Sequence, residues 1–256
     1  MLDPELSLDL LAAEGKLTVD ACTGRLDEAI PFCPAWTGRD LALHLAGVYR
    51  WVTAMVGGRL PEPPDKDLRA ALYTDPNPAD DAGVLGRLQL ALDGVVDVLR
   101  AGPVDLDCWT IWPGYSPRDF WIRRQLHETL VHRVDAQNLG RSETDAIRGA
   151  ELDTTVAADG VDEMMLGFSG RYRKLRHPEP VTLAVHATDA GAAWWCTIGP
   201  ESLDTGGGAA PGSADAALSG RAGELLLWLW NRRSAAGLEV SGDPTVLEIW
   251  TSNAHL

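Results

Sequence analysis

The sequence predicts a mixed two-domain fold, with a four-helix bundle in residues 1–142 and a small α+β domain in residues 148–256. The chain has 256 residues, which exceeds the usual size of one domain and favours two. Helical periodicity of apolar residues dominates the first part, whereas strand-like alternation enters only after it. With 45% hydrophobic and 23% charged residues, the composition is that of a globular protein with a sizeable core.

Four amphipathic helices are expected in the first domain. Their apolar spacing and punctuation place them over residues 4–28, 38–55, 79–100 and 117–138. Thr37 can cap the second helix, and Asp40 completes a weaker form of the capping box. Ser116 can cap the fourth helix, and Pro117 suits its first position. These caps fix where the second and fourth helices begin.

The expected loops follow the distribution of proline and glycine. Residues 33–37 read as a turn before the second helix, and five prolines make residues 57–78 a long loop. Residues 205–211 are a flexible glycine-rich loop and not a phosphate cradle, because they lack both the G-x-G-x-x-G spacing and a following Lys-Ser/Thr. No nucleotide site is expected there.

The second domain mixes helices and strands. Strand-like alternation over 181–188 and 193–198, with a turn at 188–191, predicts a β-hairpin. The remaining elements are helices over 152–167, 222–233 and 244–253 and a short strand over 238–241. This order of elements is typical of an α+β domain.

Charge and cysteine usage exclude several classes of function. The formal net charge of −15 would repel a phosphate backbone, and the arginines are scattered, so neither nucleic acid nor an anionic membrane is an expected partner. No apolar stretch is long enough to cross a bilayer, and the acidic start is unlike a secretory signal, which predicts a cytoplasmic protein. The four widely spaced cysteines form no C-x-x-C pair and are expected to be mostly buried, reduced thiols.

A polar stripe on the fourth expected helix carries the chemistry. Steps of four, three and four residues place on one helix face Trp121, Gln125, Glu128 and His132. The stripe is expected to turn inward, because a separate charged face is supplied by Arg123, Arg124 and Arg133. On the second helix, His44 lies between apolar residues at helical spacing and also faces inward.

Inward Glu and His residues of a bundle are a common way to hold a metal ion, because burying them unpaired costs several kcal/mol. Two other readings stay open: His44 packed in the core by itself, and Glu128 bonded to His132 or Arg133 as a surface pair. Residues 127–132 do not match the H-E-x-x-H zinc motif, because His132, which would be its second histidine, comes one residue too late.

Two motifs resemble a known family. Residues 33–48 read C-P-x-W-T-x-R-D-L-x-x-H-L-A-G-V, and residues 127–136 read H-E-T-x-x-H-R-x-D-A. Together they are similar to the mycothiol-dependent maleylpyruvate isomerase family, which has a DinB-like bundle. The second half, with its Leu-Trp-Asn-Arg stretch ending at Arg232, resembles the smaller C-terminal domain of that family.

The resemblance implies a metal site and a reaction. It implies that His44, Glu128 and His132 bind Zn²⁺ or another divalent metal, and that an arginine of the C-terminal domain acts near the active site. Arg232 matches that arginine best, with Arg233 and Arg221 as rivals.

Three protein ligands leave one coordination position of the metal open, and a thiol bound there becomes a thiolate nucleophile. The implied cosubstrate is mycothiol, and the implied substrate is a small acidic electrophile, which the enzyme isomerises or joins to the thiol. The expected assembly is a monomer or homodimer. The alternative is a non-catalytic, metal-dependent regulatory protein that binds a thiol or small acid.

Overall fold

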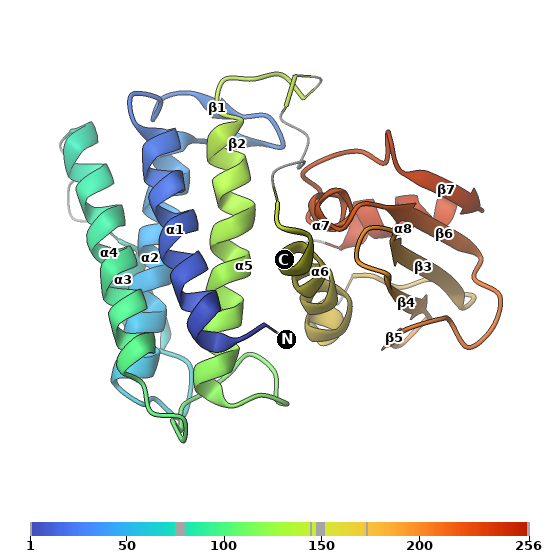
Figure 1. Cartoon of the computed structure of the whole chain (residues 1–256), viewed down its shortest axis with the longest axis horizontal. Coiled ribbons are helices and arrows are strands. Elements are labelled where there is room, and N and C mark those ends of the chain that lie inside the picture. The colour runs from blue at the N-terminus through green and yellow to red at the C-terminus, as the bar shows by residue number, and fades with distance from the viewer. Residues whose placement is uncertain (1, 75–79, 144, 147–151, 173, 255–256) are drawn as a thin grey trace. The chain divides into compact units, whose positions relative to one another are not determined.

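The computed structural model describes residues 2–74, 80–143, 145–146, 152–172 and 174–254. The chain divides into two compact units, Leu2–Ile147 and Arg148–Leu256, which are drawn in Figure 1. Two expected boundaries, the helix start at Ala79 and the domain start at residue 148, lie outside the described residues. The mixed helical and α+β fold class is confirmed.

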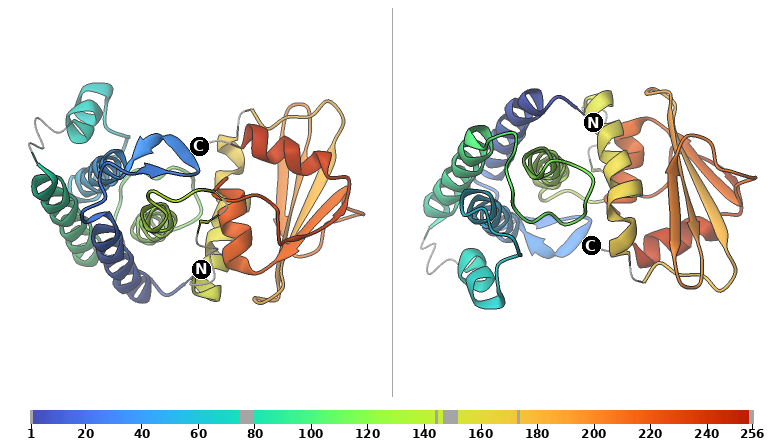
Figure 2. Two further views of the ribbon diagram at one scale, coloured as in Figure 1. Left: turned by 90° about the horizontal axis from the view of Figure 1, so that it is seen from above. Right: turned by 90° about the horizontal axis from the view of Figure 1, so that it is seen from below.

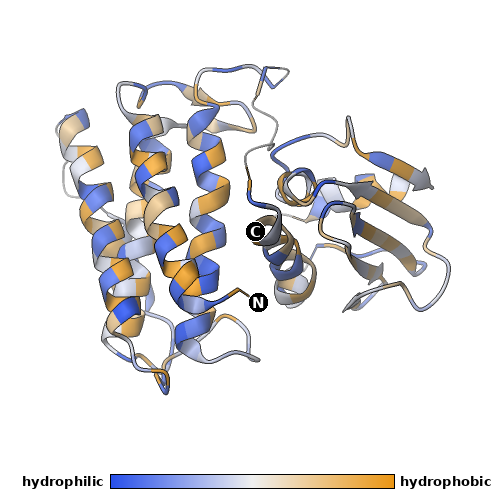
Figure 3. Ribbon diagram, in the orientation of Figure 1, coloured by the Kyte–Doolittle hydropathy of each residue, from blue (hydrophilic) through white to orange (hydrophobic). Residues whose placement is uncertain are grey.

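Four long helices form the bundle of the first unit. They are α1 (Pro4–Cys22), α2 (Gly38–Gly57), α4 (Asp81–Ala101) and α5 (Pro117–Gln137). Each of α1 and α2 packs against both α4 and α5, so that the four enclose one core. Figure 3 shows hydrophobic and hydrophilic residues alternating along these helices. The apolar stripes bury large side chains such as Leu11, Leu45 and Trp121, and this burial is the main source of bundle stability.

The capping residues act as the sequence predicts. The Thr37 hydroxyl accepts a hydrogen bond from the backbone N–H of Asp40, whose carboxylate accepts one from the backbone N–H of Thr37, a complete capping box. Ser116 accepts a hydrogen bond from the backbone N–H of Asp119, and Pro117 follows as the first residue of α5. Local sequence therefore sets the start of both helices that carry the candidate ligands.

The expected first helix and the turn after it need correction. Helix α1 stops at Cys22 instead of residue 28, because Gly24 takes a left-handed conformation with φ of 72° that few other residues adopt. The chain then forms a short antiparallel hairpin of β1 (Ala29–Ile30) and β2 (Cys33–Thr37), where a turn was expected over 33–37. The hairpin is anchored on the end of α5 by a hydrogen bond from the backbone N–H of Gly140 to the carbonyl of Ala29.

The loop expected over residues 57–78 contains a helix, α3 (Lys66–Tyr73). Asp65 caps it by accepting a hydrogen bond of 2.8 Å from the backbone N–H of Leu68. The five prolines all lie outside this segment, so nothing in residues 66–73 interrupts a helix. The prediction was wrong because the eight-residue segment is too short to show a clear periodicity.

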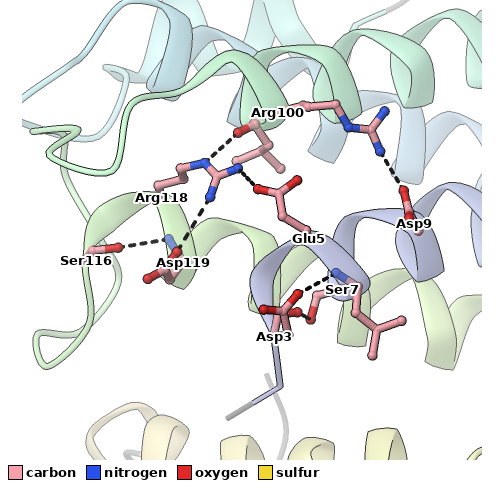
Figure 4. Close-up of polar contacts among 10 residues, drawn as sticks. Asp3, Glu5, Ser7, Asp9, Arg100, Ser116, Arg118 and Asp119 are labelled. Atoms are coloured by element: carbon pink, nitrogen blue, oxygen red, sulfur yellow. Dashed lines mark hydrogen bonds and ion pairs between the residues drawn. The ribbon is translucent and has the colours of Figure 1, made fainter.

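Buried Arg118 joins three helices at the start of α5, as Figure 4 shows. Its Nε donates a hydrogen bond of 3.0 Å to the carbonyl of Leu99, and its Nη2 lies 2.6 Å from the carboxylate of Glu5. The carbonyl of Leu99 belongs to the last turn of α4, where no helical partner is left for it. Arg118 therefore satisfies a helix end inside the bundle and connects it to α1.

The second unit is a five-stranded sheet with helices on one face. The sheet has the order β5-β4-β3-β6-β7, in which only the β3–β6 pair is parallel among the described strands. The strands are β3 (Val181–Ala187), β4 (Ala192–Ile198), β5 (Leu203–Gly207), β6 (Ala216–Gly220) and β7 (Glu239–Gly242). The helices are α6 (Thr154–Asp162), continued by a π-helical turn over Glu163–Gly167 and a 3₁₀ turn over Phe168–Arg171, α7 (Ala222–Leu229) and α8 (Thr245–Asn253). Figure 2 shows the helices on one side of the sheet.

Three expectations in this unit were wrong in detail. The glycine-rich segment begins as strand β5, in which Gly206 lies under the ring of Trp195, so that a Cβ there would meet the ring at 2.6 Å. Strand β6 was not expected; it is placed by its pairing with β3, far away in sequence. Helix α7 ends at Leu229 and not at Arg233, and Asn231 has a φ of 55° that no helix accommodates.

Two sequence expectations about the whole chain can be compared with the structure. In the described part of the chain, no helix is both long and apolar enough to cross a membrane. The four cysteines form no disulfide, and three of them, Cys22, Cys108 and Cys196, are buried. Burial raises the pKa of Cys22 to about 11 and that of Cys196 to about 12, so these thiols stay protonated at neutral pH.

Candidate metal centre

Helix α2 presents His44 at the edge of the bundle core. Its neighbours at helical spacing, Leu41 and Val48, are buried, whereas the His44 side chain keeps 27% of its surface exposed. A histidine packed fully in the core, one of the open readings, is therefore not what the structure has.

Helix α5 presents Glu128 and His132 one turn apart on one face. Their side chains are 15% and 6% exposed, so both face inward, as the polar stripe predicts. Gln125 and Trp121 continue the stripe toward the start of the helix and are also buried. The reading of Glu128 as part of a surface pair is excluded by this burial.

The structure brings the three predicted ligands together from two helices. Glu128 Oε1 lies 3.2 Å from His44 Nε2 and 3.4 Å from His132 Nε2. One donor atom from each residue lies within 4.8 Å of the other two. His127, one residue before Glu128, is not part of this group.

The expectation of a separate arginine face on α5 was wrong. Arg123, Arg124 and Arg133 are all buried, and each meets a polar partner. Arg124 lies 2.7 Å from Glu128 Oε2, Arg133 lies 2.6 Å from Glu14 of α1, and Arg123 donates a hydrogen bond to Tyr115. Most residues of helix α5 are buried, so its charged side chains are paired with polar groups of the protein instead of being solvated by water.

The charges of the cluster are strongly coupled. Burial disfavours the Glu128 carboxylate, but hydrogen bonds from His132 and His44 and the Arg124 guanidinium outweigh burial and hold its pKa well below the usual range. Burial likewise disfavours a charged His132, yet hydrogen bonds to Asp135 and Glu128 raise its pKa to about 9. Without a metal, a proton on His132 takes the place of a cation beside Glu128.

Asp135 is a residue of the candidate site that residue-by-residue reasoning missed. Its carboxylate is buried and lies 2.9 Å from Nδ1 of His132. A proton held on Nδ1 leaves Nε2, the atom that faces Glu128, free to bind a metal ion. Carboxylate–histidine pairs of this kind orient the ligands of zinc sites. The only sequence signal was the position of Asp135 in the second motif.

The donor set fits a divalent cation. Two imidazoles and one carboxylate are ligands of catalytic zinc sites, where donor atoms bind at about 2.0–2.2 Å. The two short distances from Glu128 Oε1 match the spacing between neighbouring donors around such an ion. The histidine nitrogens lie within 4.8 Å of each other, and an ion bound between them would draw them closer together. Arg124 satisfies the second oxygen of Glu128.

Two aromatic residues outside the four bundle helices stand beside the cluster. The Trp36 ring, on β2, has its centroid 4.8 Å from that of His44 and is nearly parallel to His132 at 6.2 Å. The Tyr73 ring, on α3, has its centroid 6.5 Å from that of His44. Sequence reasoning missed both because it assigned turn and loop to the two segments that carry them.

The predicted arginine belongs to the other unit. Arg232 follows α7, and its Nη1 donates a hydrogen bond of 2.9 Å to the carbonyl of Trp230. Of its two rivals, Arg233 pairs with Glu224 at 3.0 Å, and Arg221 lies 3.5 Å from Asp189. A role for Arg232 at the metal centre stays a prediction.

Comparisons with known proteins agree with this architecture. The solved structures that resemble the chain include a mycothiol-dependent maleylpyruvate isomerase and a mutant of it. Their TM-scores are 0.65 and 0.66 at 12% and 11% identity, and each comparison covers 94% of this chain and 93% of the other. At such low identity the likeness concerns the fold. No curated protein sequence matches the chain.

Two family models match the sequence directly. The mycothiol maleylpyruvate isomerase N-terminal domain matches residues 8–137, and the C-terminal domain of the same family matches residues 155–248. The three clustered donors all lie in the first match, and Arg232 lies in the second. The chain belongs to the mycothiol maleylpyruvate isomerase family.

Proposed function

We propose that the chain is a metal- and mycothiol-dependent enzyme that acts on a small acidic electrophile, with isomerisation of a compound such as maleylpyruvate as its reaction. The observation that carries the proposal is the convergence of His44, Glu128 and His132 inside a domain of this family. The isomerases with solved structures share the fold and are mycothiol-dependent.

The three residues would hold Zn²⁺ or another divalent cation. When bound, the cation would lower the pKa of a thiol that approaches it, so that the thiol reacts as its thiolate. With three protein donors, one position is left for that thiol. Arg124 and Asp135 keep the donors in place, since they bond to the outer atoms of Glu128 and His132.

The reaction follows from the chemistry of a thiolate and a conjugated cis double bond. The sulfur forms a bond to one alkene carbon, and the π electrons move onto the conjugated carbonyl oxygen as an enolate. The former double bond is then single and can rotate. When the electrons return, the carbon–sulfur bond breaks and the trans product leaves with the thiol unchanged. If the adduct is kept and protonated, the same first step gives a thiol transferase.

Arg232 is proposed to bind the carboxylate of the substrate. A guanidinium matches a carboxylate with two parallel hydrogen bonds, and an acidic substrate needs a cation in a protein whose net charge is −15. Arg232→Lys should then raise KM for the acid without altering the metal content.

The test combines metal analysis with turnover. The metal content of wild type is compared with that of His44→Ala and of His186→Ala, a control that removes an exposed histidine of the second unit. We expect about one metal per wild-type chain, loss of metal only in His44→Ala, and conversion of maleylpyruvate without net loss of mycothiol.

Two other outcomes assign different functions. Stoichiometric consumption of mycothiol would indicate a transferase instead of an isomerase. Metal-dependent binding of mycothiol without a product from any acidic electrophile tested would indicate a regulatory binding protein. No bound metal in wild-type protein would refute the proposal.

A further inference from the structure

Helix α3 carries one side chain to the metal centre, that of Tyr73. The ring packs on α2 over Gly47, where a Cβ would meet Tyr73 Cδ1 at 2.6 Å. Only a residue without a side chain leaves room for the ring here. The ring centroid lies 6.5 Å from that of His44, with the planes inclined by 53°.

The hydroxyl of Tyr73 is uncommitted. It makes no hydrogen bond with any residue that the structure describes, although the ring is half-buried. The other phenol near the centre, that of Tyr49, is bonded to the Thr129 hydroxyl at 2.8 Å. A half-buried phenol to which the described residues offer no hydrogen bond, next to a cluster of metal-type donors, is suited to hydrogen-bond a ligand.

The surroundings of Tyr73 keep the hydroxyl protonated. Burial raises its pKa, and the charge of Glu128 raises it further against the opposing effect of Arg69. The Arg69 guanidinium lies 5.8 Å from the ring centroid, a cation–π contact that helps to hold the ring in place.

We propose that the Tyr73 hydroxyl donates a hydrogen bond to the carbonyl oxygen of the electrophile and stabilises the enolate that forms there. This inference rests on the proposed function, because it concerns the enolate of that reaction. Tyr73 keeps its proton throughout: the electron pair that reaches the oxygen when the sulfur–carbon bond forms returns when that bond breaks. The bond is stronger in the enolate than in the ground-state ketone.

The test is Tyr73→Phe, which removes one oxygen and leaves the ring over Gly47. Loss of a single donor to a developing oxyanion costs about 10²-fold in kcat. KM should change by less than about twofold, because the interaction belongs to the transition state. Metal content and circular dichroism should stay those of wild type.

The matched control is Tyr115→Phe. Tyr115 precedes α5, and its hydroxyl accepts a hydrogen bond from Arg123, which lies more than one helical turn before Glu128. This control removes the same atom from the same domain and should retain wild-type kcat.

Tyr73→Leu separates the ring from the hydroxyl. If Tyr73→Phe turns over as fast as Tyr115→Phe while Tyr73→Leu raises KM, the Tyr73 ring only lines the substrate site, and the proposal for the hydroxyl is wrong. If the wild-type protein turns over substrate and the Tyr73→Phe variant has the same kcat, this inference alone is wrong. A wild-type protein without any turnover refutes the proposed function together with it.

Discussion

The contact between Asp135 and His132 offers a sharp test of how the proposed metal centre is built. Replacing Asp135 by Asn keeps the shape of the side chain but removes its charge. The carboxylate lies 2.9 Å from Nδ1 of His132, and both side chains are buried, at 2% and 6% exposure. An amide accepts that hydrogen bond less strongly, and in its other orientation it turns an N–H toward the imidazole.

The size of the effect follows from this geometry. Loss of a carboxylate partner of a metal-binding histidine lowers metal affinity about 10- to 100-fold, which is about 1.4–2.8 kcal/mol. Since the Asp135–His132 pair is buried and charge-assisted, we expect a value in the upper half of that range.

The assay is competition for Zn²⁺ between the protein and a chromophoric chelator at pH 7.5. Asp119→Asn is the control, because it removes the same charge from a partly exposed side chain in the first turn of α5, far from His132 along the helix, and should leave the affinity unchanged. Equal zinc affinity in Asp135→Asn and wild type, with both proteins folded, would refute the claim that Asp135 orients His132.

Three further predictions test the bundle and its centre. Arg118→Met should lower the free energy of unfolding by about 2 kcal/mol in urea, since it strands the buried carbonyl of Leu99; a loss below about 0.5 kcal/mol would mean that Arg118 acts only as a surface charge. In the metal-free protein, the pKa of His132 is raised from 6.5 to about 9. The stability that its proton contributes is therefore fully present below pH 6.5 and is lost as pH rises through 9. Thermal melts at pH 6 and 9 with EDTA should show this loss of stability, and saturating Zn²⁺ should abolish the difference between the two pH values. Gly47→Ala should leave metal content unchanged but displace the Tyr73 ring and lower kcat, and unchanged turnover would show that the ring position is unimportant.

Local sequence signals account for the helices that carry the candidate ligands. The capping box at Thr37 and the Ser-Pro start at Ser116 depend on contacts within four residues, and both helices begin where they were expected. Helical spacing then puts Glu128 and His132 on one face. These features follow from backbone geometry and needed no knowledge of the rest of the chain.

The surroundings of α5 could not be read from its own sequence. Three arginines on a helix indicate a solvated face in most proteins, yet here Arg133 reaches Glu14, over a hundred residues earlier in the chain. Asp135 likewise lies among charged residues that a helical plot assigns to water. Whether a charge is buried depends on partners that other helices bring to it, and spacing along one helix does not contain that information.

The sequence by itself determined the helical bundle, the two ligand-bearing helices and, through two motifs, the family. Only the tertiary structure decided which side chains surround the candidate metal centre. Trp36 is held there by a hairpin anchored on the end of α5, and Tyr73 by a short helix that fits over Gly47. Both segments are too short to show a period and too weak to form alone, so contacts between distant residues give them their structure.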